Sequence, residues 1–265
     1  MVTNSEPHKW GMVVDLDRCT GCQACVVACQ SENNLPINTK DFFQQARAYE
    51  WIRIERYWEG EFPNVKARFI PIMCQHCENA PCEPVCPVFA TYHNDQGMNV
   101  QVYNRCIGTR YCANNCPYQV RFFNWWEPTW PERFRNHLNS DVTVRSRGVM
   151  ERCSFCIQRI RRAELKVERQ EKRQLNHAVM KERNLLPACV HACPTNALNF
   201  GDQRDESGPV KKFFAALDEE GHEGSEHHGE ETARGYRLLD EMATKPNVIF
   251  LKKVDKFPLK NGVHG

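Results

Sequence analysis

The chain has 265 residues, 41% of them hydrophobic and 26% charged, which is typical of a globular protein with one or two domains. Because 35 basic residues are balanced by 33 acidic ones, the sequence does not predict a nucleic-acid binder. We find no run of about 18 apolar residues that would predict a membrane span, and MVTNSEPHKW lacks the apolar core of a secretory signal. The 15 cysteines are the unusual feature.

Short strands are predicted before and after the cysteine groups. In WGMVVDLDRC, residues 10–19, apolar residues alternate and lead into a cysteine loop, and MNVQVYNRC, residues 98–106, has the same form. ATYHND, residues 90–95, and ALNFGD, residues 197–202, follow other cysteine groups and predict closing strands. This internal repeat predicts two related modules.

The cysteines form four groups along the chain. The first group has the spacing C-x2-C-x2-C-x3-C, and the later groups carry variants of it with longer gaps. In chain order the groups are Cys19, Cys22, Cys25 and Cys29; Cys74, Cys77, Cys82 and Cys86; Cys106, Cys112 and Cys116; and Cys153, Cys156, Cys189 and Cys193.

Disulfides and zinc explain these groups less well than iron–sulfur clusters do. The cysteine count is odd, and sulfurs two or three residues apart would strain a disulfide. Zinc sites also use C-x2-C pairs, but the first group would crowd four sulfurs around one small ion. The alternative from a different functional class is a scaffold protein that is stabilised by zinc.

A C-x2-C-x2-C loop can wrap a wide iron–sulfur cube, and in two-cluster ferredoxins the fourth cysteine ligates the other cluster. The sequence therefore predicts an α+β fold of two ferredoxin-like modules, with a helical insert and a C-terminal extension. Residues 1–60 together with 145–265 form the outer module around clusters one and two, and residues 61–144 form the inserted module around clusters three and four.

Crossed ligation assigns every cysteine to one cluster. The predicted sets are Cys19, Cys22, Cys25 and Cys193 for cluster one; Cys29, Cys153, Cys156 and Cys189 for cluster two; Cys74, Cys77, Cys82 and Cys116 for cluster three; and Cys86, Cys106 and Cys112 for cluster four.

Cluster four lacks one thiolate, because Thr109 stands where the C-x2-C pattern expects a cysteine. A neutral hydroxyl is a poor iron ligand beside thiolates, so the sequence predicts a [3Fe–4S] cluster here and [4Fe–4S] clusters at the other three sites. The alternative is a [4Fe–4S] cluster whose last iron binds water or the Thr109 oxygen.

Arginines lie beside the cysteine loops, where they can offset the negative charge of the clusters through local ion pairs or can dock a partner. They are Arg105, Arg110, Arg121, Arg152, Arg159 and Arg161.

Four further segments are less specific. Residues 157–186 lack Gly and Pro and predict an exposed helical insert. The six aromatic residues in 118–131 predict either internal packing or a contact with a partner subunit. The segment 222–231 holds His222, His227 and His228, which predict a mobile loop rather than a metal site. NVIFLKKVDKFPL, residues 247–259, predicts one strand with an extended end.

The nested order of the groups resembles the four-cluster iron–sulfur subunit of the DMSO reductase class of molybdenum enzyme complexes, over roughly residues 10–200. Within that class, CIGTRYCANNCPYQVRFFNW is most similar to the iron–sulfur components of the menaquinone-reducing Qrc complex and of alternative complex III. The resemblance implies three [4Fe–4S] clusters and one [3Fe–4S] cluster.

The resemblance also implies an electron-transfer subunit without catalytic residues of its own. Electrons would pass between a molybdopterin-like subunit or multihaem cytochrome c and a polytopic membrane subunit with a quinone site, with the [3Fe–4S] cluster nearest the membrane. The expected position is peripheral on the periplasmic face of the membrane. The cytoplasmic face, as in the subunit of a molybdenum reductase or dehydrogenase, is the alternative.

Overall fold

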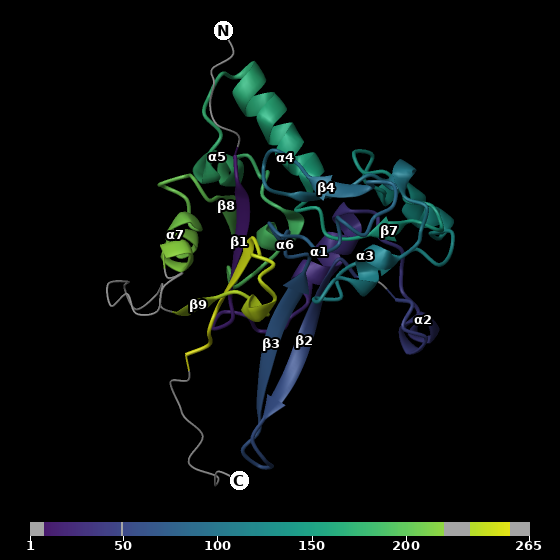
Figure 1. Cartoon of the computed structure of the whole chain (residues 1–265), viewed down its shortest axis with the longest axis horizontal. Helices are drawn as coiled ribbons and strands as arrows, with labels where there is room; N and C mark the ends of the chain where they lie inside the picture. Colours follow the sequence, from purple (N-terminus) through teal and green to yellow (C-terminus); the bar gives the residue numbers. More distant parts are fainter. Residues whose placement is uncertain (1–7, 49, 220–233, 255–265) are drawn as a thin grey trace.

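The computed structural model describes residues 8–48, 50–219 and 234–254. A four-stranded sheet of order β8–β1–β10–β9 lies at one side of the cysteine loops (Figure 1). Strand β1 is parallel to β10 and antiparallel to β8, and all six of its residues are buried. The strands are β1 (Trp10–Asp15), β8 (Leu198–Asp202), β9 (Gly235–Tyr236) and β10 (Val248–Leu251).

Helix α7, Lys211–Glu219, covers one face of this sheet. Its Phe213 and Phe214 pack against Val13 and Ile249 in a small apolar cluster. The other face of the sheet joins the main core, which contains most of the cysteines. The sheet therefore anchors the cysteine loops to a conventional hydrophobic layer.

The four strands predicted around the cysteine groups are present. Strand β8, which follows the fourth cysteine group, pairs antiparallel with β1, which precedes the first group. Strand β4, Thr91–His93, follows the second group and pairs in the same way with β5, Asn99–Gln101, before the third group. The predicted strand near the C-terminus is confirmed as β10, whereas residues 255–265 lie outside the described residues.

A long β-hairpin projects from the body of the protein (Figure 1). Strands β2, Ile52–Glu59, and β3, Lys66–Met73, pair antiparallel from Ile52 and Met73 outward. Near its tip Trp58 and Phe62 are exposed, at 63% and 91%. The turn of this hairpin contains the predicted module boundary at residues 60–61.

Short helices follow the cysteine loops, and further short elements connect them. Strand β6, Phe122–Phe123, pairs with β7, Met150–Glu151, across the predicted boundary at residues 144–145. The other elements are α1 (Ala24–Glu32), α2 (Lys40–Gln44), η1 (Tyr103–Arg105), α3 (Tyr111–Asn114), η2 (Glu132–His137), α6 (Ala188–His191) and η5 (Asp240–Met242). None of the helices among the described residues is long and apolar enough to cross a membrane.

The segment 157–186 is helical over most of its length, as the predicted helical insert requires, but it is divided into several helices and one row of its side chains is buried. Helix α4, Ile157–Ala163, continues into a π-helix, η3, Glu164–Gln170, and α5, His177–Glu182, follows after an irregular stretch. Apolar residues recur at helical spacing in this charged segment, so they lie on one side of it and pack into the core. The buried residues are Ile160, Ala163, Val167, Leu175, Val179 and Met180.

The aromatic segment 118–131 contributes to internal packing. Tyr118 is buried, and its hydroxyl donates to the Leu238 carbonyl oxygen at 3.1 Å. Trp126 packs against the core and stacks on Phe42, with ring centroids 3.9 Å apart. The interpretation as packing is therefore confirmed for these two residues.

Candidate iron–sulfur sites

Four cysteines from two distant segments of the chain line one cavity. Cys19, Cys22 and Cys25 come from the first loop, and Cys193 follows α6. Burial and the other three thiols raise the pKa of Cys25 to about 12. At Cys193 burial also raises the pKa, but the Thr195 hydroxyl and nearby backbone N–H groups outweigh it and lower the pKa overall. Four thiols therefore converge on one point beside hydrogen-bond donors that favour the thiolate form.

A second set of thiols lies deeper in the protein. Its members Cys29, Cys153, Cys156 and Cys189 are all buried. Burial, and then the three other thiols, raise the pKa of Cys29 well above its ordinary value. The Asn33 amide lies 3.5 Å from the Cys29 sulfur and 3.8 Å from the Cys156 sulfur, and it donates to both.

A third set of thiols lines another cavity. The set consists of Cys74, Cys77, Cys82 and Cys116. Burial and the neighbouring thiols raise the pKa of Cys77, and burial raises that of Cys82 to about 11. The Cys82 sulfur accepts hydrogen bonds from Arg121 at 3.4 Å and from the Asn99 amide at 3.7 Å.

The fourth set has three thiols. Arg121 lies close to both Cys86 and Cys112. The Ala90 backbone N–H donates to Cys86 at 3.2 Å. Burial raises the pKa of Cys86, but the Ala90 N–H and other backbone N–H donors outweigh burial and lower the pKa overall. Cys106 accepts a hydrogen bond from the Met150 backbone N–H at 3.3 Å.

The Cys106–Cys112 loop has the backbone conformation of the first cysteine loop. Gly21 and Gln23 are left-handed, with φ of 70° and 62°, and Gly108 and Arg110 repeat this pattern with 72° and 63°. In each loop a helix begins directly after the second left-handed residue: α1 begins at Ala24, after Gln23, and α3 begins at Tyr111, after Arg110. Thr109 therefore occupies in its loop the place that Cys22 occupies in the other.

Neighbouring sets of thiols are close enough to influence one another. The charge of Cys25 raises the pKa of Cys189, and the charge of Cys74 raises that of Cys153. Arg121 interacts with Cys82 of the third set and with Cys112 of the fourth. These contacts order the sets in one series, from the first to the fourth.

Comparison with known proteins identifies the family. Two models of a 4Fe-4S dicluster domain match residues 18–90 and 65–131. The chain is 40% identical over 247 residues to the menaquinone reductase iron-sulfur cluster-binding subunit of Nitratidesulfovibrio vulgaris, a match that covers 92% of this chain and 89% of that protein. It is 31% identical over 234 residues to the arsenate respiratory reductase iron-sulfur subunit of a Shewanella species, covering 78% and 87%.

The chain belongs to the iron–sulfur subunits of the DMSO reductase class. It is an electron-transport protein of the 4Fe-4S type, as the sequence motifs predict. The residues of the sites fit such cofactors, because thiols converge in sets and backbone and amide N–H groups point at their sulfurs.

The amide donors are functional residues that the sequence analysis missed. Asn33 and Asn99 are 1% and 2% exposed, and each reaches the sulfur of a cysteine from a different part of the chain. An asparagine carries no signature for such a role, since only the fold brings Asn99 beside Cys82.

The arginines beside the loops differ in their partners. Arg159 forms an ion pair with Glu32 at 2.6 Å, as expected for a local role. Arg110 lies over the Trp125 ring at 4.8 Å. Arg121 donates to a cysteine sulfur instead. The histidines of the segment 222–231 lie outside the described residues.

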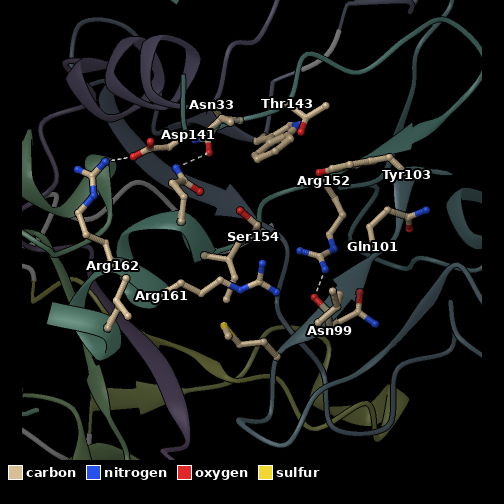
Figure 2. Close-up of a pocket in the computed structure, with 17 residues that line it drawn as sticks. Asn33, Asn99, Gln101, Tyr103, Asp141, Thr143, Arg152, Ser154, Arg161 and Arg162 are labelled. Atoms are coloured by element: carbon tan, nitrogen blue, oxygen red, sulfur yellow. Dashed lines mark hydrogen bonds and ion pairs between the residues drawn. The ribbon is translucent and has the colours of Figure 1, made fainter. Parts of the chain in front are cut away.

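A pocket of about 550 Å³ is lined by residues from several segments of the chain (Figure 2). Asn33 and Asn99, which contact cysteine sulfurs, lie in its wall together with Arg152. Arg162 is paired with Asp141 at the rim. The pocket contains no cysteine among its lining residues and is separate from the cavities at the thiols.

Proposed function

We propose that this chain is the electron-relay subunit of a membrane-bound respiratory oxidoreductase complex. Three [4Fe–4S] clusters and one [3Fe–4S] cluster carry electrons between a molybdopterin-type or multihaem cytochrome c partner and a membrane subunit with a quinone site. The single observation that carries this proposal is the convergence of distant cysteines on common cavities, with the loops of the second and third sets joined by the stacked rings of His76 and Phe155.

The ligand sets are those of crossed ligation, in which each module exchanges one cysteine between its two clusters. The convergence of the thiols on common cavities supports the first and third sets. The proposed ligands are Cys19, Cys22, Cys25 and Cys193 for cluster one; Cys29, Cys153, Cys156 and Cys189 for cluster two; Cys74, Cys77, Cys82 and Cys116 for cluster three; and Cys86, Cys106 and Cys112 for cluster four.

The end of the series at cluster four contacts the membrane subunit in this proposal. Apolar side chains within three residues of its cysteines along the chain are exposed: Phe89 at 72%, Ile107 at 65% and Tyr111 at 59%. Exposed apolar surface is typical of a protein interface. Their position puts an apolar contact within reach of the last cluster, as electron transfer to a partner requires.

The relatives support the type of complex. The Nitratidesulfovibrio vulgaris protein is a subunit of a menaquinone reductase, and a quinone-side partner for this chain follows by analogy. The proposed location is peripheral on the periplasmic face of the membrane, with the cytoplasmic face as the alternative. The modules are residues 1–60 with 145–265, and residues 61–144, because the β8–β1 and β4–β5 pairs repeat one arrangement.

Anaerobic metal analysis of the purified complex tests this proposal. After the iron of the partner subunits is subtracted, the chain is expected to account for about 15 iron atoms, and low-temperature EPR of the oxidised protein is expected to show a [3Fe–4S] signal. Zinc in place of iron would instead support the scaffold alternative, which the C-x2-C pair Cys153 and Cys156 favours. Turnover of a substrate by the chain without its partners would contradict a relay function.

A further inference from the structure

Arg121 is a buried cation between the third and fourth sets of thiols. Its side chain is 5% exposed. The Nη1 atom donates to the Cys82 sulfur at 3.4 Å and to the Asn99 Oδ1 at 3.0 Å, and Nη2 donates to the Gln101 Oε1 at 2.5 Å. The guanidinium also interacts with Cys112.

No carboxylate pairs with this guanidinium among the described residues. Burying a charge costs several kcal/mol unless an opposite charge compensates it. Arg145, which is also buried, meets that need with the Glu151 carboxylate at 2.9 Å. The Glu83 carboxylate contacts the Asn99 amide and the His93 ring, and no contact joins it to Arg121. The counter-charge of Arg121 therefore comes from the cysteine sulfurs.

The position of Arg121 brings its charge to both neighbouring sets. The guanidinium lies beside Cys82 of the third set and Cys112 of the fourth, so it can stabilise negative charge at both sites.

The corresponding junction in the outer module has a different composition. There Cys25 and Cys189 are influenced by burial, by other thiols and by the backbone N–H groups of Val26 and Val190. The outer module also has cations near its thiols, because Arg152 lies close to Cys153 and Arg159 lies close to Cys156 and Cys189. Arg159 is paired with the Glu32 carboxylate at 2.6 Å, whereas Arg121 has no such carboxylate partner among the described residues.

We propose that Arg121 raises the reduction potentials of clusters three and four above the values that these clusters would have without its charge. Reduction adds one negative charge to a cluster, and a nearby fixed cation stabilises the reduced form. This inference rests on the proposed function, since it requires the clusters that the ligand sets would hold.

EPR-monitored redox titration of the purified complex tests the role of Arg121. Arg121→Gln removes the charge but keeps hydrogen-bond donors. This variant is expected to lower the reduction potentials of cluster three and of the [3Fe–4S] cluster four. Each should fall by at least about 59 mV, which corresponds to a tenfold change in the ratio of reduced to oxidised cluster. The other two potentials are the internal control. Arg121→Lys retains the charge and is expected to stay closer to the parent.

Gln101→Glu is a second route to the same result, for use if Arg121→Gln does not retain its clusters. It keeps the arginine and adds a carboxylate at the atom that Nη2 already contacts, so the same two potentials are expected to fall. Arg183→Gln is the matched control, because Arg183 is paired with Glu171 at 3.0 Å in the insert. It removes the same charge and is expected to leave all four potentials unchanged.

The outcomes separate the two proposals. If the parent complex lacks iron–sulfur EPR signals, the proposed function is wrong. If the signals are present but the potentials of clusters three and four do not move in Arg121→Gln and Gln101→Glu, the role of Arg121 is overturned. Equal shifts of all four potentials, or loss of the clusters in every variant at both positions, would also overturn it, because they indicate a structural role alone.

Discussion

The rings of His76 and Phe155 stack with their centroids 3.9 Å apart and an angle of 23° between their planes. Each residue is 1% exposed and directly precedes the second cysteine of a C-x2-C pair, His76 before Cys77 and Phe155 before Cys156. Both have a left-handed backbone, with φ of 45° and 53°. The two loops therefore face each other through these rings, which joins the second and third sets of thiols.

The stack makes Phe155 a sensitive point for stability. Phe155→Ala removes a buried ring that also contacts Phe200, with ring centroids 5.3 Å apart. The free energy of unfolding of the cluster-loaded protein is expected to fall by about 3–5 kcal/mol, as measured by anaerobic denaturant unfolding. Phe62→Ala, at a 91% exposed position, is the control and is expected to change it by less than about 0.5 kcal/mol. Equal losses in the two variants would contradict the packing role.

Thr109→Cys is expected to convert the cluster at the fourth set from [3Fe–4S] to [4Fe–4S]. The loop already has the backbone conformation of the Cys19–Cys25 loop, so the new thiol stands in the place of Cys22. Oxidised-state EPR should lose the [3Fe–4S] signal, and the iron content should rise by about one atom per chain. Ile107→Cys adds a thiol at an exposed neighbouring position and should change neither quantity. Persistence of the signal in Thr109→Cys would show that the threonine does not cause it.

Gly108 is expected to tolerate no side chain. A Cβ atom there would overlap the Gly148 carbonyl oxygen, and the left-handed φ of 72° adds strain for alanine of about 1–2 kcal/mol. Gly108→Ala should therefore deplete the [3Fe–4S] signal. Gly97→Ala carries the same strain at φ 73°, but its Cβ would come no closer than 3.4 Å to Lys9. EPR spin counts that fall equally in both variants would exclude the overlap as the cause.

The stability of the chain is expected to depend on pH through His8. Burial lowers the pKa of His8, but its contacts with Asp202 at 2.6 Å and Glu168 at 3.0 Å raise it to about 9 in total. Because this pKa lies above the ordinary value of 6.5, the stabilisation is complete below pH 6.5 and is lost as the pH rises through 9. Thermal unfolding midpoints should fall over that window.

His8→Gln supplies the control for this pH dependence. Glutamine keeps a hydrogen-bonding side chain but does not titrate, so the fall in the unfolding midpoint between pH 6.5 and 9 should become shallower in this variant. An identical pH profile in the parent and in His8→Gln would contradict the assignment to His8.

The sequence predicts the local features of this fold well. Alternating apolar residues before Cys19 and before Cys106 become strands β1 and β5, because a period of two in the residue pattern is a property of the segment itself. The burial of all six residues of β1 does not follow from that pattern, because it depends on packing against both faces of the sheet. The cysteine spacing likewise predicts the loops that carry the thiols. Thr109 is recognisable as the deviating position from the motif alone.

Other features depend on contacts between distant segments and were not predictable. The pairing of β1 with β10 joins the two ends of the described chain, and no local pattern specifies it. The row of residues from Ile160 to Met180 is buried because the core covers it, although the segment is rich in charge. The difference between Arg121, which faces sulfurs, and Arg145, which faces Glu151, also appears only in the folded chain.

An anomalous-scattering map at the iron edge, from crystals of the cluster-loaded complex, would locate every iron centre within this chain. Four separate iron centres in one series are expected, with Cys193 bound to the centre of Cys25 and Cys29 bound to the centre of Cys153. A map in which Cys29 and Cys193 share one centre, or in which fewer than four iron centres appear, would contradict this arrangement.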